Sequence, residues 1–236
     1  MQQTGEWVAF DIEIGNEFEL KPGEDLDSHG PFDITVAAWC DESAGVRHWF
    51  TPDGSGQAGP MMTAETAKGM LQELRRRQLA GDRLVAWNGL SFDLRWVGVA
   101  AGDPGLAREV ALDLIDPMFQ FFVARGFPVS LAAVAEGLGV AEAKLMSGAD
   151  APGEWARGDR AKVFDYVAGD CRITLDVARR IERAGEVRWR TRRGTVSREP
   201  MPEMKAVRDL LNAPEPDTSW MDDPLPRSKF TAWLAG

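Results

Sequence analysis

The segment 7–14, WVAFDIEI, constrains the fold most, because it is strongly strand-like and yet contains two acidic residues. Side chains alternate between the two faces of a β-strand, so Asp11 and Glu13 point to the same face. The apolar residues at the even-numbered positions point to the other face, where we expect them to be buried. Two neighbouring carboxylates repel each other, and burial increases that repulsion. The segment therefore predicts a strand whose acidic face requires a compensating charge.

A divalent cation is one source of that charge, because Mg²⁺ and Mn²⁺ prefer carboxylate oxygens as ligands. The alternative is an edge strand with one face in solvent. Trp7 and Ala9 share the face of the two acids and are not polar, which argues against a solvated face. An Asp-x-Glu pattern also occurs often by chance, so this pair alone does not establish a metal site.

The composition is that of an ordinary soluble protein, with 44% hydrophobic and 27% charged residues in a chain of 236. No apolar run is long enough to cross a membrane, and the N-terminal residues have no signal-peptide pattern. Cys40 and Cys171 are the only cysteines, and they lack the spacing of a metal site. We therefore expect a reduced, cytoplasmic chain without a disulfide framework and without a membrane partner.

The formal net charge of −10 argues against a protein that binds nucleic acid through bulk electrostatic attraction. It does not exclude an enzyme whose acids are concentrated at a metal site and whose basic residues form a local patch. The arginines do cluster, at positions 75–77 and again between Arg179 and Arg193.

The order of the hydrophobic patterns predicts an α/β protein with a mixed five-stranded sheet flanked by helices. The expected strands are an antiparallel meander followed by parallel strands: 6–14, 32–40, 46–50, 83–87 and 110–115. The expected helices are 63–80, one that begins after an N-cap at Ser91, one that begins at Pro117 after an N-cap at Asp116, 130–139 and 159–184. Residues 146–155 are expected to form a loop.

Asp93 and Asp170 are further acids whose positions require an explanation. Asp93 comes just after the expected strand 83–87, and open α/β sheets bind their ligands at such carboxyl ends. It also lies in the first turn of a helix, where the helix dipole favours an acid. Asp170 interrupts the apolar stripe of the helix 159–184, where an unpaired carboxylate is costly. Tyr166, the only tyrosine, precedes it by one turn on the same side.

Taken in order, three motifs resemble those of the DEDD superfamily of 3′→5′ exonucleases, a DnaQ-like group with an RNase H-like fold. The motifs are Asp11-Ile12-Glu13, Asn88-x-x-x-Phe92-Asp93 and Tyr166-x-x-x-Asp170. A tyrosine four residues before the last aspartate resembles the DEDDy subgroup, and Asp165 stands where the other subgroup has histidine. The chain is most similar to predicted exonucleases that resemble the proofreading domain of family B DNA polymerases, over about residues 6–184.

The resemblance implies a two-metal site, in which Mg²⁺ or Mn²⁺ ions are held by Asp11, Glu13, Asp93 and Asp170. It also implies that Tyr166 orients the attacking water, and that Asn88 and Phe92 shape the pocket for the terminal nucleotide. The implied reaction removes nucleoside 5′-monophosphates from the 3′ ends of single-stranded DNA or RNA, with DNA favoured. Ile14 departs from the family pattern, which often has threonine there. Asp113 ends an expected strand, and the sequence leaves open whether it belongs to the site.

The chain changes character after Gly185, so we expect an exonuclease domain at 1–185 and a C-terminal extension at 186–236. The extension has the pattern of an arginine-rich hairpin around Gly194, a short helix and a proline-rich segment. It matches no known module, and its composition predicts only partial order.

Arg188, Arg190 and Trp189 in that hairpin are candidate substrate-binding residues, the arginines for backbone phosphates and the tryptophan for stacking on a base. The alternative is that these arginines only form a solvated face. A protein partner bound through the extension is a further expectation, because the chain is too short to contain a polymerase palm or thumb.

Three other functions stay open at this point. The chain could be a catalytically silent RNase H-like module that binds nucleic acid or a partner protein. It could be an RNase H-like endonuclease, although the Tyr-x-x-x-Asp motif argues against that. The third alternative is a regulatory subunit that docks through residues 186–236.

Overall fold

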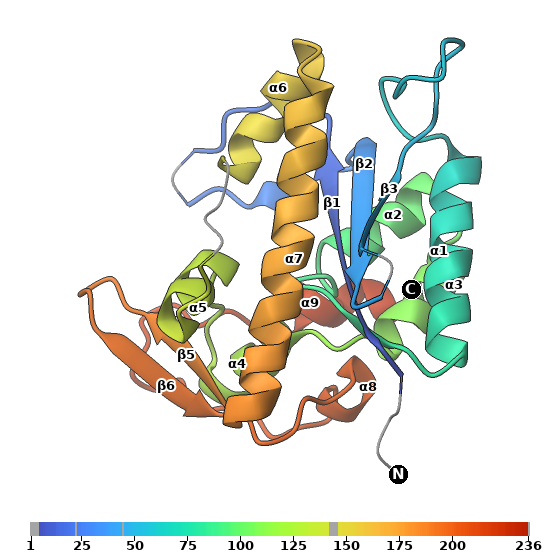
Figure 1. Cartoon of the computed structure of the whole chain (residues 1–236). Coiled ribbons are helices and arrows are strands. Elements are labelled where there is room, and N and C mark those ends of the chain that lie inside the picture. The colour runs from blue at the N-terminus through green and yellow to red at the C-terminus, as the bar shows by residue number, and fades with distance from the viewer. Residues whose placement is uncertain (1–4, 22, 44, 142–145, 236) are drawn as a thin grey trace.

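A four-stranded mixed sheet lies at the centre of the computed structural model, which describes residues 5–21, 23–43, 45–141 and 146–235 (Figure 1). The strands, in chain order, are β1 (Trp7–Ile14), β2 (Ile34–Asp41), β3 (Gly45–Trp49) and β4 (Arg83–Val85). In space their order is β3-β2-β1-β4. The first three form the predicted antiparallel meander, and β4 pairs in parallel with β1.

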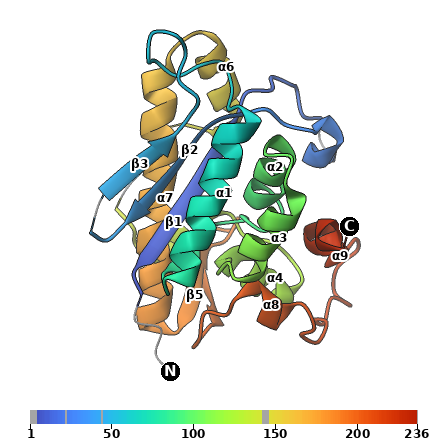
Figure 2. The same ribbon diagram turned by 90° about the vertical axis from the view of Figure 1, so that its right-hand side faces the viewer.

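Helices cover both faces of the sheet (Figure 2). One face is crossed by α7 (Arg160–Ala184), which contacts β1 and β2 along the molecule. The other face is covered by α1 (Ala64–Leu79), α2 (Asp93–Ala100) and α3 (Pro104–Leu112). The two long helices that the sequence predicted at 63–80 and 159–184 are therefore present. The Thr63 side chain caps α1, whereas α7 begins without a side-chain cap.

The strand β1 separates two hydrophobic clusters, which explains its almost continuous apolar sequence. Its residues Val8, Phe10, Ile12 and Ile14 pack into a cluster with α1, α2 and α3. On the opposite face, Trp7 and Ala9 pack into a second cluster with side chains of α7. The face that contains the two acids is therefore not an open, solvated face but lies under α7.

Two predicted elements are wrong because local patterns gave ambiguous signals. Residues 110–115 do not form a fifth strand: α3 continues to Leu112, and only Ile115 forms isolated bridges. The helix begins at Pro104 after a side-chain cap from Asp103, and a short, mostly apolar run of six residues was too short to distinguish helix from strand. Ser91 is not a cap either, because α2 begins at Asp93 and the Ser91 hydroxyl instead donates to Asn88 Oδ1 at 2.6 Å.

The segment 146–155 is also helical rather than a loop. It contains a 3₁₀ turn, η2 (Gly148–Asp150), and a short helix, α6 (Ala151–Ala156). Ala151 and Trp155 are buried, and Trp155 donates from Nε1 to the carbonyl of Pro60 at 2.8 Å. Tertiary burial of these two side chains stabilises a helix that its glycine and proline would not form alone.

The remaining helices of the first 185 residues are η1 (Leu26–His29), α4 (Pro117–Arg125) and α5 (Leu131–Leu138). Asp116 caps α4 as the sequence predicted, and the Ser130 side chain caps α5, where the sequence predicted only a helix. None of the helices in the described part of the chain has the length and apolar character needed to span a membrane.

Residues 186–235 are ordered and continue the fold. The predicted hairpin is present as β5 (Glu186–Arg190) and β6 (Val196–Pro200), with Gly194 at a φ of +78° in its turn. The short helices that follow are α8 (Val207–Leu210), α9 (Ser228–Thr231) and η3 (Ala232–Leu234). Val207, Leu210 and Phe230 are buried in the same hydrophobic cluster as Val8 of β1. This part of the chain therefore shares the core of the first part.

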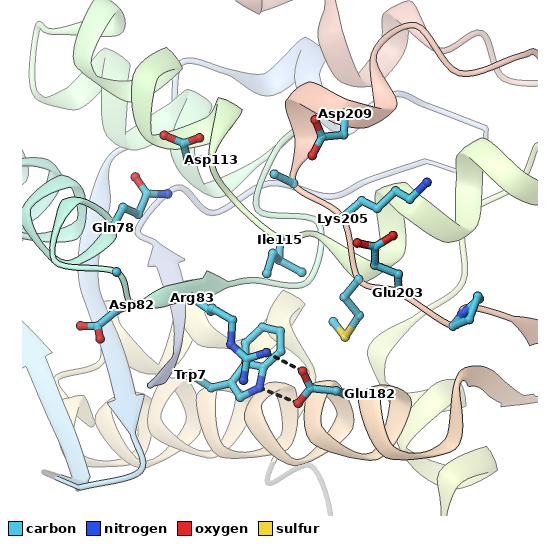
Figure 3. Close-up of a pocket in the computed structure, with 14 residues that line it drawn as sticks. Trp7, Gln78, Asp82, Arg83, Asp113, Ile115, Glu182, Glu203, Lys205 and Asp209 are labelled. Carbon is cyan, nitrogen blue, oxygen red and sulfur yellow. Dashed lines mark hydrogen bonds and ion pairs between the residues drawn. The ribbon is translucent and has the colours of Figure 1, made fainter. Parts of the chain in front are cut away.

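A polar cavity of about 740 Å³ lies at the amino end of β1, where α7 ends and residues 202–209 pass (Figure 3). Glu182 accepts a hydrogen bond from Trp7 Nε1 at 3.1 Å and forms an ion pair with Arg83. The Arg83 guanidinium lies 3.9 Å from the centroid of the Trp7 ring. These contacts fix the end of α7 against the two parallel strands.

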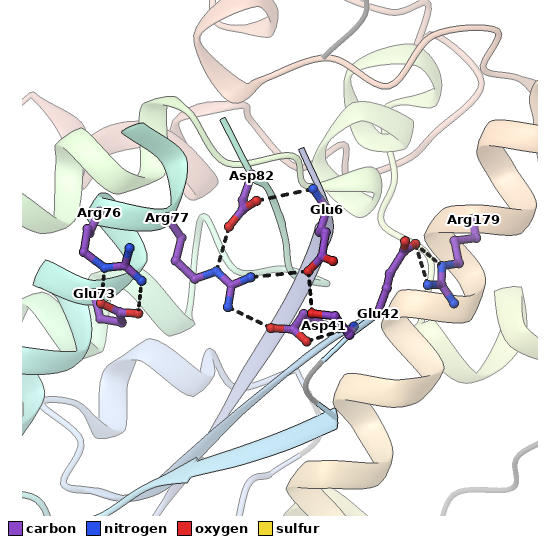
Figure 4. Close-up of polar contacts among 9 residues, drawn as sticks. Glu6, Asp41, Glu42, Glu73, Arg76, Arg77, Asp82 and Arg179 are labelled. Carbon is purple, nitrogen blue, oxygen red and sulfur yellow. Dashed lines mark hydrogen bonds and ion pairs between the residues drawn. The ribbon is translucent and has the colours of Figure 1, made fainter. Parts of the chain in front are cut away.

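A cluster of ion pairs joins α1 to the sheet near the same end (Figure 4). Arg77 donates to Asp82 at 2.8 Å and to Asp41 at 2.7 Å. Asp41 is only 6% exposed at the end of β2, and Asp82 lies just before β4. One guanidinium therefore compensates a buried carboxylate and links α1, β2 and β4.

The replacement Arg77→Met is expected to destabilise the protein by about 3 kcal/mol, because it leaves the buried Asp41 carboxylate without its cation. Chemical unfolding followed by tryptophan fluorescence measures this. The matched control is Arg76→Met on the neighbouring position of α1, where the guanidinium is exposed and pairs with Glu73. We expect the control to leave the unfolding midpoint almost unchanged. Equal effects of the two variants would contradict the assignment.

Candidate functional site

The residues of all three motifs line one cavity of about 810 Å³, which we call the first cavity. They reach it from β1, from the turn that follows β4, from the start of α2 and from α7. The motif residues on its wall are Asp11, Glu13, Asn88, Phe92, Asp93, Tyr166 and Asp170. Segments more than 150 residues apart in the chain, such as those of Asp11 and Asp170, thus meet at one place.

The end of β1 opens toward this cavity because its neighbours diverge. The parallel pairing with β4 ends at Ala9 and Val85, so the acidic part of β1 has no strand on that side. On the other side, the pairing with β2 is irregular between Glu13 and Ile14. Irregular pairing of this kind changes the direction of side chains at a strand end. It explains how Glu13 is only 7% exposed and still lines the cavity.

Asp116 holds the turn that carries the second motif. Its carboxylate accepts the backbone N–H groups of Asn88 at 3.2 Å and Leu90 at 3.0 Å. It also accepts those of Met118 and Phe119 at the start of α4, both at 3.1 Å. Burial raises the pKa of Asp116 to about 6, and the four hydrogen bonds oppose that rise. The sequence predicted its role as a cap but not its contact with the turn.

The turn itself has a constrained backbone. Asn88 has a φ of +67°, a region that favours glycine or asparagine. Gly89 packs so closely that a Cβ atom would lie 2.4 Å from the Cβ atom of Ala86. The side chains of Asp93 and Phe92 are therefore presented to the cavity by a turn with little freedom to move.

Tyr166 and Asp170 lie one turn apart on the inner side of α7 and are 2% and 6% exposed. Burial raises the pKa of the Tyr166 hydroxyl far above its usual value, and the charges of Asp170 and Glu13 add to the rise. The hydroxyl therefore remains protonated at any physiological pH. A neutral phenol at this position can donate a hydrogen bond to an oxygen in the cavity.

Asp93 is a buried acid of the site whose pKa is raised. It is 3% exposed, and burial raises its pKa to about 7, with the negative charges of Asp116 and Asp170 contributing. Its Oδ1 atom is buried and has no hydrogen-bond partner among the described residues. A buried carboxylate in this state is stabilised by any cation that reaches it.

The first cavity is strongly acidic. Its wall contains eight carboxylates, and the one basic side chain among the described residues on it is Arg157, which pairs with Glu154 at 3.2 Å. The carboxylates of the three motifs offer oxygen ligands to a metal ion, and such ligands suit hard divalent cations. As they stand, however, no three His, Cys, Asp or Glu side chains among the described residues are grouped so that they could hold an ion.

A second cavity of about 570 Å³ adjoins the first. Together we call them the cleft, and the residues on the walls of both are Asp11, Leu26, Trp87, Asn88, Phe92 and Asp170. Trp87 is fixed by a hydrogen bond from Nε1 to the carbonyl of Val129 at 3.0 Å. Aromatic side chains therefore lie beside the carboxylates in both parts of the cleft.

The residues predicted to bind substrate from the β5–β6 hairpin lie elsewhere. Trp189 is 9% exposed, and its ring packs against Phe121 at 5.0 Å and Phe127 at 6.4 Å between centroids. The expectation that it stacks on a base is therefore wrong. Arg188 pairs with Glu186 at 2.6 Å and Arg190 with Glu136 at 3.3 Å, and neither lines the cleft. The two arginines form an exposed, ion-paired face, which was the alternative interpretation.

Asp113 lies outside the cleft as well. It lines the amino-end cavity of Figure 3 and forms ion pairs with Arg75, at 2.6 Å, and with Arg208. The question that the sequence left open is answered by these contacts, which assign Asp113 a structural role at the opposite end of the sheet.

Comparisons with known proteins find similarity among solved structures. No family model matches the chain, and no curated protein matches it. Among solved structures, the chain is similar to the family B DNA polymerase from the hyperthermophilic archaeon Pyrobaculum calidifontis, with 20% sequence identity and a TM-score of 0.49. The match covers 75% of this chain and 24% of the polymerase chain, so the chain corresponds to a minor part of that protein.

The variant Asp93→Asn is expected to be more stable than the wild type at pH 7.5 in the presence of a chelator. In the wild type, the folded-state pKa of Asp93 is about 7 and exceeds the ordinary value of 3.8. Ionisation of Asp93 therefore destabilises the folded state increasingly as pH rises from about 4 to about 7. A difference of about three units corresponds to at most about 4 kcal/mol. Urea unfolding of both proteins at pH 5 and pH 7.5 measures the effect.

The control for this prediction is Asp113→Asn, which removes an ion-paired acid outside the cleft and should not stabilise the protein. A divalent cation should stabilise the wild type more than Asp93→Asn. A stability difference between wild type and Asp93→Asn that does not grow with pH would contradict the assignment of Asp93 as an uncompensated buried acid.

Proposed function

We propose that this protein is a metal-dependent 3′→5′ exonuclease of the DEDDy type, which removes nucleoside 5′-monophosphates from single-stranded nucleic acid, with DNA favoured. The observation that carries the proposal is the convergence of the three motifs on one acidic cavity. A chance occurrence of Asp-x-Glu or Tyr-x-x-x-Asp would not place these residues beside each other. The shared wall with an aromatic second cavity also supports a nucleotide ligand.

Asp11, Glu13, Asp93 and Asp170 would hold Mg²⁺ or Mn²⁺. When bound, such ions lower the pKa of a water molecule and neutralise charge on the leaving oxygen. The four carboxylates contribute ligands of one chemical type from two rigid elements and one constrained turn. Because Asp93 is only partly ionised near pH 7, ion binding and its deprotonation are expected to be linked.

Tyr166 would orient a water molecule or a phosphate oxygen. Its raised pKa keeps the hydroxyl protonated, and its place one turn before Asp170 directs it to the same side of α7. A neutral hydroxyl can donate to an oxygen that becomes negatively charged, and it can accept a hydrogen bond from water at the same time. Its function is therefore positioning rather than proton transfer.

The aromatic part of the cleft would hold the terminal nucleotides. Phe92 and Trp87 line both cavities, and Asn88 presents an amide beside them. Stacking on an aromatic ring accepts every base, because each base has a flat π face. This fits an exonuclease that removes nucleotides in succession without reading their sequence.

A catalytically silent nucleic-acid-binding module is the second candidate. The observation that favours it is that the carboxylates are not grouped into a ready metal site among the described residues. Such a module would bind an oligonucleotide in the cleft and would leave it intact in every metal.

The first test is hydrolysis of 5′-labelled single-stranded DNA and RNA of matched sequence in Mn²⁺ or Mg²⁺. We expect products that shorten stepwise from the 3′ end. Asp170→Ala removes a proposed ligand of the ions and should lower the rate at least about a hundredfold, where each factor of ten corresponds to about 1.4 kcal/mol of barrier. Circular single-stranded DNA should stay intact, which distinguishes an endonuclease. Asp113→Ala is the control and should retain the wild-type rate. Well-folded protein that digests neither substrate would favour the silent module.

Tyr166→Phe removes only the hydroxyl and keeps the buried ring. We expect kcat to fall about tenfold to a hundredfold, while KM and the concentration of metal needed for half activity remain similar, since loss of positioning affects the reacting oxygen rather than ion binding. Steady-state kinetics across a metal titration measures both. A large increase in the metal requirement would contradict the assigned role.

A further inference from the structure

The C-terminal residues form one wall of the second cavity. Leu225, Lys229 and Phe230 line it together with Trp87 and Phe92. No motif in this part of the chain predicted a contact with the site. The helix α9, which carries Lys229 and Phe230, lies beside the group of helices α2, α3 and α4 in Figure 2.

This wall is firmly attached to the elements that build the site. The Phe230 ring is buried and packs 4.3 Å from Phe122 and 6.0 Å from Phe119 of α4, measured between centroids. Trp233 donates from Nε1 to the carbonyl of Leu90 at 2.9 Å, in the turn that Asp116 holds. The position of Lys229 is therefore fixed relative to Asp93 by buried contacts and not by a loose tail.

Lys229 is the one basic residue among the described residues that line the second cavity. Its ammonium group contacts Asp25, the N-cap of the 3₁₀ turn η1, and donates a hydrogen bond to Asp27 within that turn at 2.9 Å. Asp27 also accepts a hydrogen bond from Arg95 at 2.6 Å. Two acids and two basic residues thus balance at the rim, so this side of the cleft does not repel an anion as the first cavity does.

A nucleic-acid strand brings one negative charge for every nucleotide it places in the cleft. Away from the ions, such a phosphate needs a fixed cation, because the second cavity also presents the carboxylates of Asp11, Asp27 and Asp170 and has no other basic residue among the described residues on its wall. Lysine has three donors on a flexible stem, and ion pairs at exposed positions are weak. A phosphate can therefore share the Lys229 ammonium with Asp25, whose side chain is 54% exposed.

We propose that the second cavity holds the nucleotide next to the scissile end of a single-stranded substrate, with its base against Trp87 and Phe92 and its backbone phosphate on Lys229. This inference rests on the proposed exonuclease function and adds a residue from the C-terminal segment to substrate binding. It assigns that segment to the cleft instead of to a separate docking role.

The test compares the wild type with Lys229→Gln, Lys229→Arg and Asp25→Asn in steady-state hydrolysis of single-stranded DNA at several salt concentrations. Lys229→Gln is expected to raise KM about fivefold with kcat within about twofold, and to reduce the slope of log KM against log salt by about 0.7, the loss of one phosphate contact. Lys229→Arg should retain most of the affinity. Asp25→Asn frees the ammonium from one carboxylate and should lower KM.

The matched control is Lys205→Gln, which removes the same charge from an exposed position at the amino-end cavity of Figure 3. It should change neither KM nor the salt slope. Equal KM changes in the two glutamine variants, or a wild-type KM and slope in Lys229→Gln, would overturn the inference. So would an increase of KM in Asp25→Asn, because a purely structural ion pair predicts the same sign for both partners.

Failure of the underlying function is separately visible. If the wild type itself digests no oligonucleotide, the exonuclease proposal falls and this inference falls with it. If the wild type is active and only the Lys229 variants behave like the control, the exonuclease proposal stands and this inference alone is overturned. Melting temperatures of all variants show whether a KM change reflects binding, and Lys229→Arg decides the case in which Lys229→Gln is unstable.

Discussion

Repulsion among carboxylates confined to one cavity is the constraint on which the structure of the site depends. Four acids from three motifs line the cavity, and burial raises the pKa of Asp93 to about 7, with the negative charges of Asp116 and Asp170 adding to the rise. Such an arrangement persists only where other contacts hold the elements in place. The apolar clusters on both faces of β1 provide those contacts, because they fix Asp11 and Glu13 without using the acids themselves. The stability of the fold thus maintains an arrangement that is unfavourable by itself.

Rigid elements present each functional side chain, and buried polar contacts join them. Tyr166 and Asp170 belong to a 25-residue helix that lies across the sheet. Asn88 and Asp93 belong to a turn whose backbone is held by Asp116, a carboxylate with four backbone N–H donors. Because Asp116 also caps α4, and α4 packs against Phe230, the turn and the C-terminal wall share one support. Changes in this support would move both sides of the cleft together.

The sequence predicted the elements and acids whose signals are local. A short run of β-branched and aromatic residues defined β1, and a long apolar stripe defined α7, so Asp11, Glu13 and Asp170 were placed correctly on their elements. The sequence failed where tertiary burial decides. Residues 110–115 fit helix and strand equally well, and Trp189 in an arginine-rich hairpin gave no sign of its contact with Phe121. The contacts of Lys229 with Asp25 and Asp27 join positions more than 200 residues apart, and no pattern within either segment encodes them.

The acidity of the chain and a polyanionic substrate are compatible only if positive charge is local. The hairpin arginines do not provide it, because Arg188 and Arg190 are paired with acids on an exposed face. On the proposed function, ions in the first cavity and Lys229 at the second are the two remaining sources near the strand. Lys229 is carried by a segment whose Phe230 belongs to the same buried cluster as Val8 of β1. This wall of the second cavity is thus built on the hydrophobic core of the first part of the chain, so the C-terminal segment is not an independent unit.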